Sequence, residues 1–341
     1  MTAKQAATTT PPDFGTLQSL APDLVWFRAP LPMTIGHVNI YLVQDNAGWV
    51  MVDAGFGDRS ALEFWARMVT GPLADFRIHA ILVTHAHIDH IGGAGWLCRR
   101  LGAELWMGRE EYLIARLDHA DPGQFGRADH QRHFRNMGLD PETSQGIADF
   151  KMAELAGLTT LPDTYRPLVP GQFLRIGQRR FRILSAPGHS PAQILLHDRD
   201  GGLLIAADQV MDGPSPPLTI LPTEPALQSY DLLLDSLRRI ERDVHTETLV
   251  LAGHFAPFRD LRRAIGATRA HHAGRAAQVL EAVRDAPLTV AQAMEVVIRA
   301  GLNPRQCHFA IGEILAYAHH LVARRQAIWR TDDGIRRLSA M

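Results

Sequence analysis

The sequence predicts a layered α/β fold that is followed by a helical C-terminal part. The first observation is that a strand-like apolar run at 80–84 precedes a helical stretch at 91–101 and a second strand-like run at 104–107. This alternation is typical of α/β layers. The second observation is the composition, since 46% of the 341 residues are hydrophobic and 21% are charged. A chain of this length and composition buries a core, which excludes a disordered chain, a collagen and a coiled-coil rod.

The N-terminal elements are predicted from the spacing of apolar residues. Residues 1–19 lack the apolar core of a signal peptide, so we expect a flexible leader and a fold that begins at residue 20. Strands are predicted at 38–43 and 49–53, on either side of a turn that contains Asp, Asn and Gly. Helical spacing follows at 59–69.

Residues 109–165 contain helical stretches and few strand signals. We interpret them as a helical insertion in a domain that runs from 20 to 260. Long insertions are commonly lids over functional sites, so we expect this one to cover any site that the domain carries. The insertion holds His119, His130 and His133, and it stays open whether one of them reaches the site.

Strand patterns resume after the insertion. They are found at 181–185, 194–197, 203–206 and 248–252, with an amphipathic helix at 225–243. Residues 261–341 then change character. Helices are predicted there at 261–284, 290–300 and 305–326, and a hairpin signal follows at 331–334. Three helices and a terminal hairpin predict a winged-helix-like C-terminal domain.

Charge and cysteine content limit the partners. The chain has a net charge of −1, but residues 261–341 hold 12 Arg against 6 acidic residues, a local net of +6. This basic tail leaves nucleic acid or an anionic substrate open as a partner without favouring it. No run of 18 apolar residues occurs, so we expect no membrane span. Two cysteines, Cys98 and Cys307, make no disulfide framework, and we predict a cytoplasmic protein.

The chemistry is concentrated directly after the strand predicted at 80–84. Four potential metal ligands, His85, His87, Asp89 and His90, lie within six residues. Imidazole and carboxylate groups together suit Zn²⁺ and neighbouring transition metals. His85 and His87 share a face in an extended chain and can bind one ion. Asp89 and His90 follow after the chain turns, so they can bind a second ion nearby.

A solvated, histidine-rich loop is the simpler interpretation of this motif. It would have to explain several ligand types together at a strand end, which is where sites form in α/β folds. We therefore favour a metal site.

These residues resemble the metallo-β-lactamase superfamily, whose signature His-x-His-x-Asp-His is present at 85–90. The resemblance covers residues 23–258 and extends more loosely to the C-terminus. It implies an αββα sandwich of two sheets with outer helices. The helical insertion and the helical tail resemble the glyoxalase II-like and lactamase-beta-2-like hydrolases.

The resemblance also implies the remaining ligands. The turn Pro187-Gly188-His189-Ser190-Pro191 places His189 as the third ligand of the first metal, and Asp208, after the strand at 203–206, bridges both metals. His254, after the strand at 248–252, completes the second metal site. Asp53 is expected behind the ligands, where it supports their geometry. Two positions depart from the family pattern, since Ala207 and Ala192 stand where glycine is usual.

The function implied is hydrolysis at two divalent metal ions, with zinc as the first choice and iron or manganese as alternatives. The ions would lower the pKa of a shared water towards about 7, and the hydroxide would attack a thioester, ester or lactone carbonyl. Asp208 would bridge the ions and Asp89 would help to orient the hydroxide. The partner expected is a small-molecule acyl substrate, and homodimer formation stays open.

Three alternatives stay open. The first is a metal-dependent ribonuclease of the lactamase-like group, which would use the basic tail on RNA. The second is a mono-iron enzyme of the persulfide dioxygenase type, which would not need His254. The third is a metal-stabilised binding module, and the complete ligand set argues against it. Ser190 is expected to be a turn residue, Cys98 a small buried hydrophobe, and His37 either a residue of the site or a packed histidine.

Overall fold

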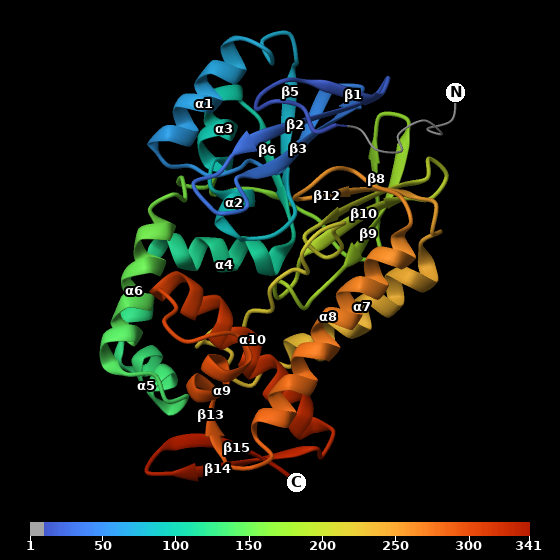
Figure 1. The fold of residues 1–341 in the computed structure, drawn as a ribbon. Helices are drawn as coiled ribbons and strands as arrows, with labels where there is room; N and C mark the ends of the chain where they lie inside the picture. The colour runs from blue at the N-terminus through green and yellow to red at the C-terminus, as the bar shows by residue number, and fades with distance from the viewer. Residues whose placement is uncertain (1–9) are drawn as a thin grey trace.

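Two β-sheets face each other in the computed structural model, which describes residues 10–341 (Figure 1). The first sheet has the order β1-β2-β3-β4-β5-β6-β7 and the second the order β12-β11-β10-β9-β8. The strands of the first sheet are β1 (Gln18–Ala21), β2 (Leu24–Pro30), β3 (His37–Asp45), β4 (Gly48–Val52), β5 (Ile78–Val83), β6 (Glu104–Met107) and β7 (Arg166–Pro167). Those of the second sheet are β8 (Phe173–Ile176), β9 (Arg179–Ser185), β10 (Ile194–Asp198), β11 (Leu203–Ala207) and β12 (Leu249–Ala252).

Helices cover the outer face of each sheet. Against the first sheet lie α1 (Arg59–Thr70), α2 (Ile88–Ile91), α3 (Ala94–Leu101) and α4 (Arg109–Ala120), and against the second lie α7 (Ser229–Asp243) and α8 (Leu261–Ala282). The predicted αββα sandwich is confirmed. The helix predicted at 225–243 begins only at Ser229, because the preceding residues form turns and irregular chain.

Strand β2 shows why the sheets pack as layers. Successive side chains of a strand point to opposite faces. Leu24 and Trp26 therefore enter the core between the two sheets, whereas Val25 and Phe27 pack with α1 and α3. Because both faces of β2 pack against apolar layers, consecutive residues of this strand are hydrophobic and buried.

The N-terminal segment differs from the expected flexible leader. Residues 1–9 lie outside the described residues. Pro12 is buried and its carbonyl accepts a hydrogen bond from Nε of Arg28 over 2.7 Å. Phe14 bridges to Arg28, and β1 pairs with β2 from Gln18. This segment packs against the sheet because β2 offers it a free edge and a cationic partner.

The insertion consists of helices, as predicted. After α4 come the short 3₁₀ helix η1 (Gln124–Gly126), α5 (Ala128–Asn136) and α6 (Pro141–Leu155). Asp140 caps α6 by accepting from the backbone N–H of Thr143 over 2.8 Å, and Pro141 occupies the first turn, where no N–H is needed. Helix α6 contacts α10 of the C-terminal part, so the insertion and the C-terminal helices form one body.

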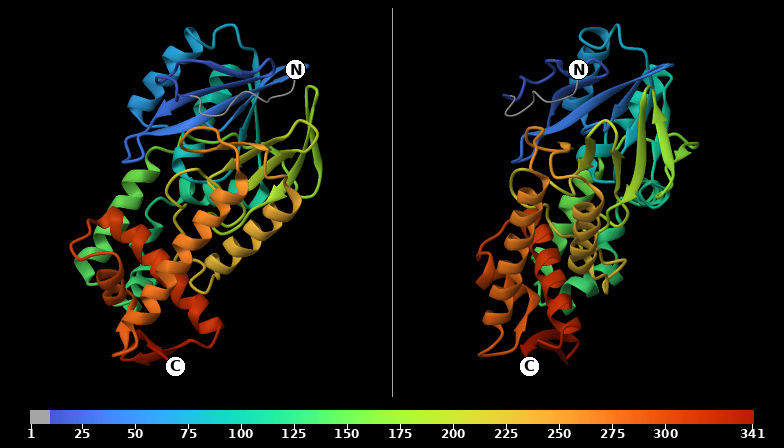
Figure 2. Two further views of the ribbon diagram at one scale, coloured as in Figure 1. Left: turned by 45° about the vertical axis from the view of Figure 1, so that its right-hand side comes forward. Right: turned by 90° about the vertical axis from the view of Figure 1, so that its right-hand side faces the viewer.

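The C-terminal part lies at the end of the molecule opposite the first sheet's β1–β4 (Figure 2). It contains α8, β13 (Leu288–Thr289), α9 (Val290–Val297), α10 (Pro304–Ala323), β14 (Ala327–Asp332) and β15 (Ile335–Ala340). The predicted hairpin is confirmed: Asp333 (φ 47°) and Gly334 (φ 78°) form its turn. Strand β13, which was not predicted, adds a third strand beside β15. Among the described residues, no helix is long and apolar enough to cross a membrane.

The topology brings the ends of four strands together. Strands β9, β11 and β12 run in the same direction, since β10 is antiparallel to both β9 and β11, and β11 is parallel to β12. Their carboxyl ends therefore meet at one edge of the second sheet, and the end of β5 in the first sheet faces them. Sites of α/β proteins form at such edges.

Candidate metal centre

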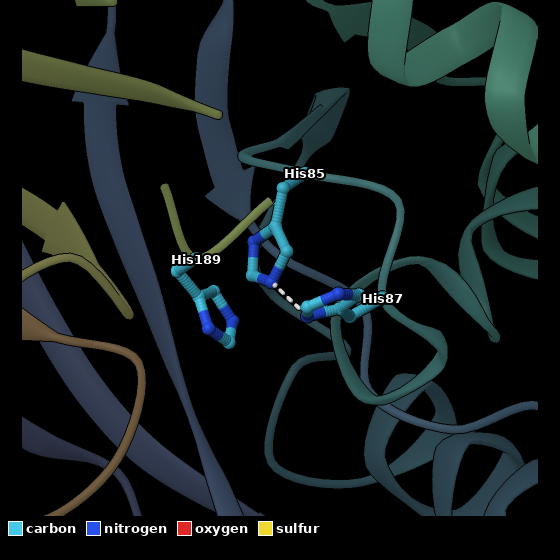
Figure 3. A group of neighbouring side chains, drawn as sticks. All are labelled: His85, His87 and His189. Atoms are coloured by element: carbon cyan, nitrogen blue, oxygen red, sulfur yellow. Dashed lines mark hydrogen bonds between the residues drawn. The ribbon is translucent and has the colours of Figure 1, made fainter. Parts of the chain in front are cut away.

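The loop between β5 and α2 carries the first two ligands of the predicted centre. Nε2 of His85 lies 3.1 Å from Nδ1 of His87. Figure 3 shows these two rings and that of His189 pointing toward one another. The ligand nitrogens of the three residues lie within 4.8 Å of one another, which is the spacing of ligands around a single ion.

Asp208 lies between the histidines from several elements. Its Oδ2 is 3.5 Å from Nε2 of His189 and 3.2 Å from Nε2 of His254. Its Oδ1 is 3.4 Å from Nε2 of His90. Oδ2 thus lies between a histidine that neighbours His85 and His87 and a histidine that neighbours Asp89, which suits a ligand that bridges two ions.

Asp89, His90 and His254 form a second group within 4.8 Å of one another. Nε2 of His254 lies 3.3 Å from Oδ2 of Asp89, and Nε2 of His90 lies 3.7 Å from the same oxygen. All seven residues predicted from the sequence are therefore brought together at one place.

Three hydrogen bonds orient the imidazoles. The Nδ1–H of His90 donates to Oδ2 of Asp53 over 2.8 Å, and the Nδ1–H of His189 donates to the carbonyl of Pro217 over 2.9 Å. The Nδ1–H of His254 donates to the carbonyl of His37 over 2.7 Å. Because each Nδ1 carries the proton, each Nε2 presents a lone pair to the centre.

The polar atoms at the centre fit metal ions. Nε2 of His90, Nε2 of His189 and Oδ1 of Asp208 are buried and make no hydrogen bond to any residue that the structure describes. Leaving such groups unpaired costs free energy, and divalent metal ions would satisfy them all. Nitrogen and carboxylate ligands in this ratio suit Zn²⁺ and other transition metals.

Buried charges shape the electrostatics. Burial lowers the pKa of His85 well below its ordinary value, and the neighbouring His90 and His87 lower it further, so this imidazole is neutral. Burial opposes the charge of Asp208, but His254 and His90 outweigh it and hold the pKa of this carboxyl well below its usual range. A neutral imidazole and an ionised carboxylate are the forms that bind a metal ion.

Backbone geometry beside the ligands is constrained. A Cβ on Gly253 would lie 2.1 Å from Oδ1 of Asp208 and 2.7 Å from Cε1 of His90, so only glycine fits between them. Ala207 stands where the family usually has glycine. Its φ of 43° lies in the left-handed region, which is unfavourable for a residue with a Cβ. Asp208 keeps its place despite that substitution.

Glu111 of α4 was not predicted from the sequence. It is fully buried, and its Oε1 accepts from Oγ–H of Ser190 over 2.5 Å and from the N–H of Ala192 over 2.7 Å. Its Oε2 accepts from the N–H of Ala86 over 2.8 Å. Glu111 thus ties the His85–His87 loop to the His189 turn. No signal marked it, because a glutamate in a helix's first turn is ordinary.

Ser190, Cys98 and His37, which were considered from the sequence as further candidates, each have a structural role. Ser190 is a turn residue bound to Glu111, and Cys98 is a buried hydrophobe, as expected. His37 supports the site from behind: its Nε2 accepts from the N–H of Phe255 over 3.0 Å, and its carbonyl holds His254. Burial and the neighbouring His254 lower the pKa of His37 to about 4.

The metal centre opens into a cavity of about 610 Å³. The insertion contributes walls from α4, η1, α5 and α6, and the C-terminal helix α10 contributes His308 and Phe309. Of the three histidines of the insertion, His130 is the one that lines this cavity. The insertion therefore borders the cavity beside the ligands, where the sequence placed a lid.

Comparison with known proteins identifies the family. Residues 33–254 match the metallo-beta-lactamase superfamily, and residues 276–341 match the metallo-beta-lactamase-like C-terminal domain. A crystal structure of a beta-lactamase domain protein from Burkholderia ambifaria is 32% identical, covers 98% of this chain and 97% of its own, and superposes with a TM-score of 0.88. The chain belongs to the metallo-beta-lactamase superfamily.

Two curated relatives carry an activity in their names. Acyl-coenzyme A thioesterase MBLAC2 of Bos taurus is 26% identical over 255 residues, which are 71% of this chain and 81% of the relative. Hydroxyacylglutathione hydrolase GloC of Haemophilus influenzae is 24% identical over 180 residues, 53% of this chain and 70% of the relative. The predicted membership of the metallo-β-lactamase superfamily of hydrolases is confirmed.

Proposed function

We propose that this protein is a dinuclear metallo-hydrolase that cleaves small acyl thioesters, with esters and lactones as poorer substrates. The observation that carries the proposal is that seven candidate ligand side chains lie together. Three of them present a buried polar atom that has no hydrogen-bond partner among the described residues. The names of the two relatives, one acting on acyl-coenzyme A and one on hydroxyacylglutathione, favour the thioester within the acyl class.

Each ligand has a proposed assignment. One ion would be held by His85, His87 and His189, and the other by Asp89, His90 and His254. Asp208 would contact both, because its Oδ2 lies 3.5 Å from Nε2 of His189 in the first group and 3.2 Å from Nε2 of His254 in the second. Zinc is the metal we propose first, because three imidazoles on one ion are a common zinc set.

Two bound ions would supply an acidified water near neutral pH and a Lewis acid for the substrate carbonyl. The chain's own residues set up the reaction. Asp53, Pro217 and His37 hold three imidazole rings in one tautomer, so no reorganisation is needed when substrate binds. Asp89 and Asp208 place two negative charges beside the reacting groups, and their carboxylate oxygens would accept hydrogen bonds from the attacking water.

The cavity supports a small-molecule substrate. Its walls include the insertion, α10, residues 211–227 and the loop at 33–35, which enclose the space beside the ligands. An RNA strand needs an open, basic groove, whereas this cavity is largely apolar.

The position of His254 favours the hydrolase over the mono-iron dioxygenase. A single facial iron site needs two histidines and one carboxylate. Here Nε2 of His254 lies 3.3 Å from Asp89 and 3.2 Å from Asp208, in a group of ligands separate from that of His85, His87 and His189. A second metal position explains these contacts.

The proposal is tested by metal analysis and a substrate screen on one preparation. Zinc-loaded protein is expected to bind close to two equivalents per chain and to hydrolyse acyl thioesters at least tenfold faster than matched esters, lactones or RNA. Saturation at one equivalent, or RNA cleavage that exceeds thioester hydrolysis, would overturn it.

A further inference from the structure

His308 stands out within the catalytic cavity. It lies in the first turns of α10, in the C-terminal part, and its side chain lines the same cavity as His87 and Asp208. Only 6% of the residue is exposed, and the structure shows no hydrogen bond from its ring to another described residue. Its ring nitrogens are not among the fully enclosed polar atoms, so a ligand or water in the cavity can supply their partner.

Three aromatic rings pack around the imidazole of His308. Its ring contacts those of Phe125 at 6.2 Å, Phe150 at 6.1 Å and Phe309 at 5.2 Å between centroids. These three neighbours offer no hydrogen-bonding group. Burial, with a smaller effect of the Lys151 ammonium, lowers the pKa of His308 well below its ordinary value, so the ring is neutral and can both donate and accept.

The cavity wall near His308 combines aliphatic side chains with charged groups of the insertion. Ile114, Leu117 and Leu155 supply aliphatic surface. Nζ of Lys151 pairs with Oε2 of Glu154 over 2.5 Å, and both side chains are largely buried. Asp118, which accepts from Nε2 of Gln124 over 2.8 Å, adds a second carboxylate. Two carboxylates face one ammonium there, so this part of the cavity has no spare positive charge.

We propose that His308 hydrogen-bonds an uncharged polar group of the substrate, a hydroxyl or an amide, and that this end of the cavity rejects a carboxylate. His308 is thereby a specificity-determining residue supplied by the C-terminal part to a reaction performed at the sandwich edge. This inference rests on the proposed function and names the substrate class further: neutral acyl thioesters whose chain carries a hydrogen-bonding group.

Electrostatics explains the selectivity. A neutral imidazole satisfies a hydroxyl or an amide without a net charge, and the apolar wall covers the rest of the chain. A substrate carboxylate would be buried against Asp118 and Glu154, with Lys151 already paired. Burying a charge without a free counter-ion costs far more than burying a hydroxyl that is hydrogen-bonded.

The test measures binding separately from hydrolysis. Non-hydrolysable thioethers of one thiol and one chain length, ending in methyl, hydroxyl or carboxylate, are titrated calorimetrically into the metal-loaded protein. The variants are His308→Phe, which keeps the aromatic packing, and His308→Gln, which keeps a hydrogen-bonding group. Phe309→Leu is the matched control, because it alters the same wall without removing a polar group. Metal content is measured for each.

Wild type is expected to bind the hydroxyl probe about tenfold more tightly than the methyl probe, the scale of one neutral hydrogen bond. The carboxylate probe is expected to bind at least tenfold more weakly than the methyl probe. His308→Phe removes the hydroxyl preference, His308→Gln keeps part of it, and Phe309→Leu weakens all three probes alike.

A wild type without hydroxyl preference, or a His308→Phe protein that keeps it, would overturn the inference. Carboxylate binding as tight as methyl binding would do the same. The binding pattern is read independently of turnover. A protein that binds these probes as expected but hydrolyses no thioester would refute the proposed function alone.

Discussion

His90 of α2 is hydrogen-bonded to Asp53, whose carboxylate also links the ends of β4 and β5 beside the candidate metal centre. The Nδ1–H of His90 in α2 donates to Oδ2 of Asp53, which directly follows β4, over 2.8 Å. Oδ1 of Asp53 accepts from the backbone N–H of Thr84 over 2.9 Å, at the end of β5. One buried carboxylate therefore orients a ligand and fixes the loop that carries two others.

Replacing Asp53 with Asn should weaken metal binding. Asp53 has φ 62°, which asparagine tolerates, so the backbone should persist. The amide lacks the charge that supports His90, and we expect a 10–100-fold loss of metal affinity, the usual effect of losing such a partner. Competition with a chelator measures it. Asp58→Asn is the control, because Asp58 caps α1 and asparagine caps equally well. Equal affinities of Asp53→Asn and Asp58→Asn proteins would contradict the orienting role.

Replacing Asp208 with Asn should separate catalysis from folding. The change keeps the size and one oxygen but removes the charge that faces His90, His189 and His254. We expect the second metal equivalent to bind more weakly and hydrolysis to fall at least about a hundredfold. Bound metal and hydrolysis rate are measured beside the circular dichroism spectrum. A folded variant with near-wild-type activity would rule out the assigned mechanism.

Replacing Gly253 with Ala should disrupt the centre by sterics alone. The new Cβ would meet Oδ1 of Asp208 at 2.1 Å, so the carboxylate or the backbone must move. We expect a loss of at least one metal equivalent per chain. Gly266→Ala is the matched control, because Gly266 lies in α8 with open space around it and alanine there should stabilise the protein by about 0.5–1 kcal/mol. Full metal loading of Gly253→Ala protein would show that the close approach is not required.

Replacing Glu111 with Gln should destabilise the fold around both ligand loops. A glutamine amide has one acceptor oxygen, so at least one of the three donors from Ala86, Ser190 and Ala192 would lose its partner. The expected cost is roughly 1–3 kcal/mol of unfolding free energy. Denaturant unfolding measures it. The neighbouring exposed Glu110→Gln should change stability by less than about 0.5 kcal/mol. Equal effects of the two variants would refute the tying role of Glu111.

Glu313 of α10 should make stability depend on pH. Burial raises the pKa of this carboxyl from 4.5 to about 7, against the attraction of Arg275. As pH rises from about 4.5 to 7, the unfolded chain loses this proton while the folded chain keeps it, so the contribution to stability falls and then levels off. Glu313→Gln removes the contribution. The stability of wild type relative to the variant should therefore fall by roughly 2 kcal/mol between about pH 5.5 and pH 8. A pH-independent difference would contradict it.

The sequence by itself predicted the alternating strands and helices and four candidate ligands, His85, His87, Asp89 and His90, whereas its resemblance to the metallo-β-lactamase superfamily implied the sandwich and the other three ligands. Apolar runs mark buried strands wherever they occur, because burial on both faces leaves no room for polar residues. The ligand types after those runs, at His85, His189, Asp208 and His254, are chemically distinctive, since carboxylate and imidazole are otherwise costly at a buried strand end. Local pattern and chemistry are sufficient for the strands and for the cluster at 85–90, and the family resemblance added the other three ligands.

Only the tertiary structure decided what supports and encloses the centre. Glu111 and His308 lie in ordinary helical sequence, and each acquires its role from a segment far along the chain: Ser190 for Glu111 and the insertion for His308. The segment at 12–19 likewise depends on the edge of β2, and β13 on β15. Local spacing cannot report these contacts, because a helix or loop residue's partner is set by how distant elements pack, whereas a ligand's chemistry is carried by the residue itself.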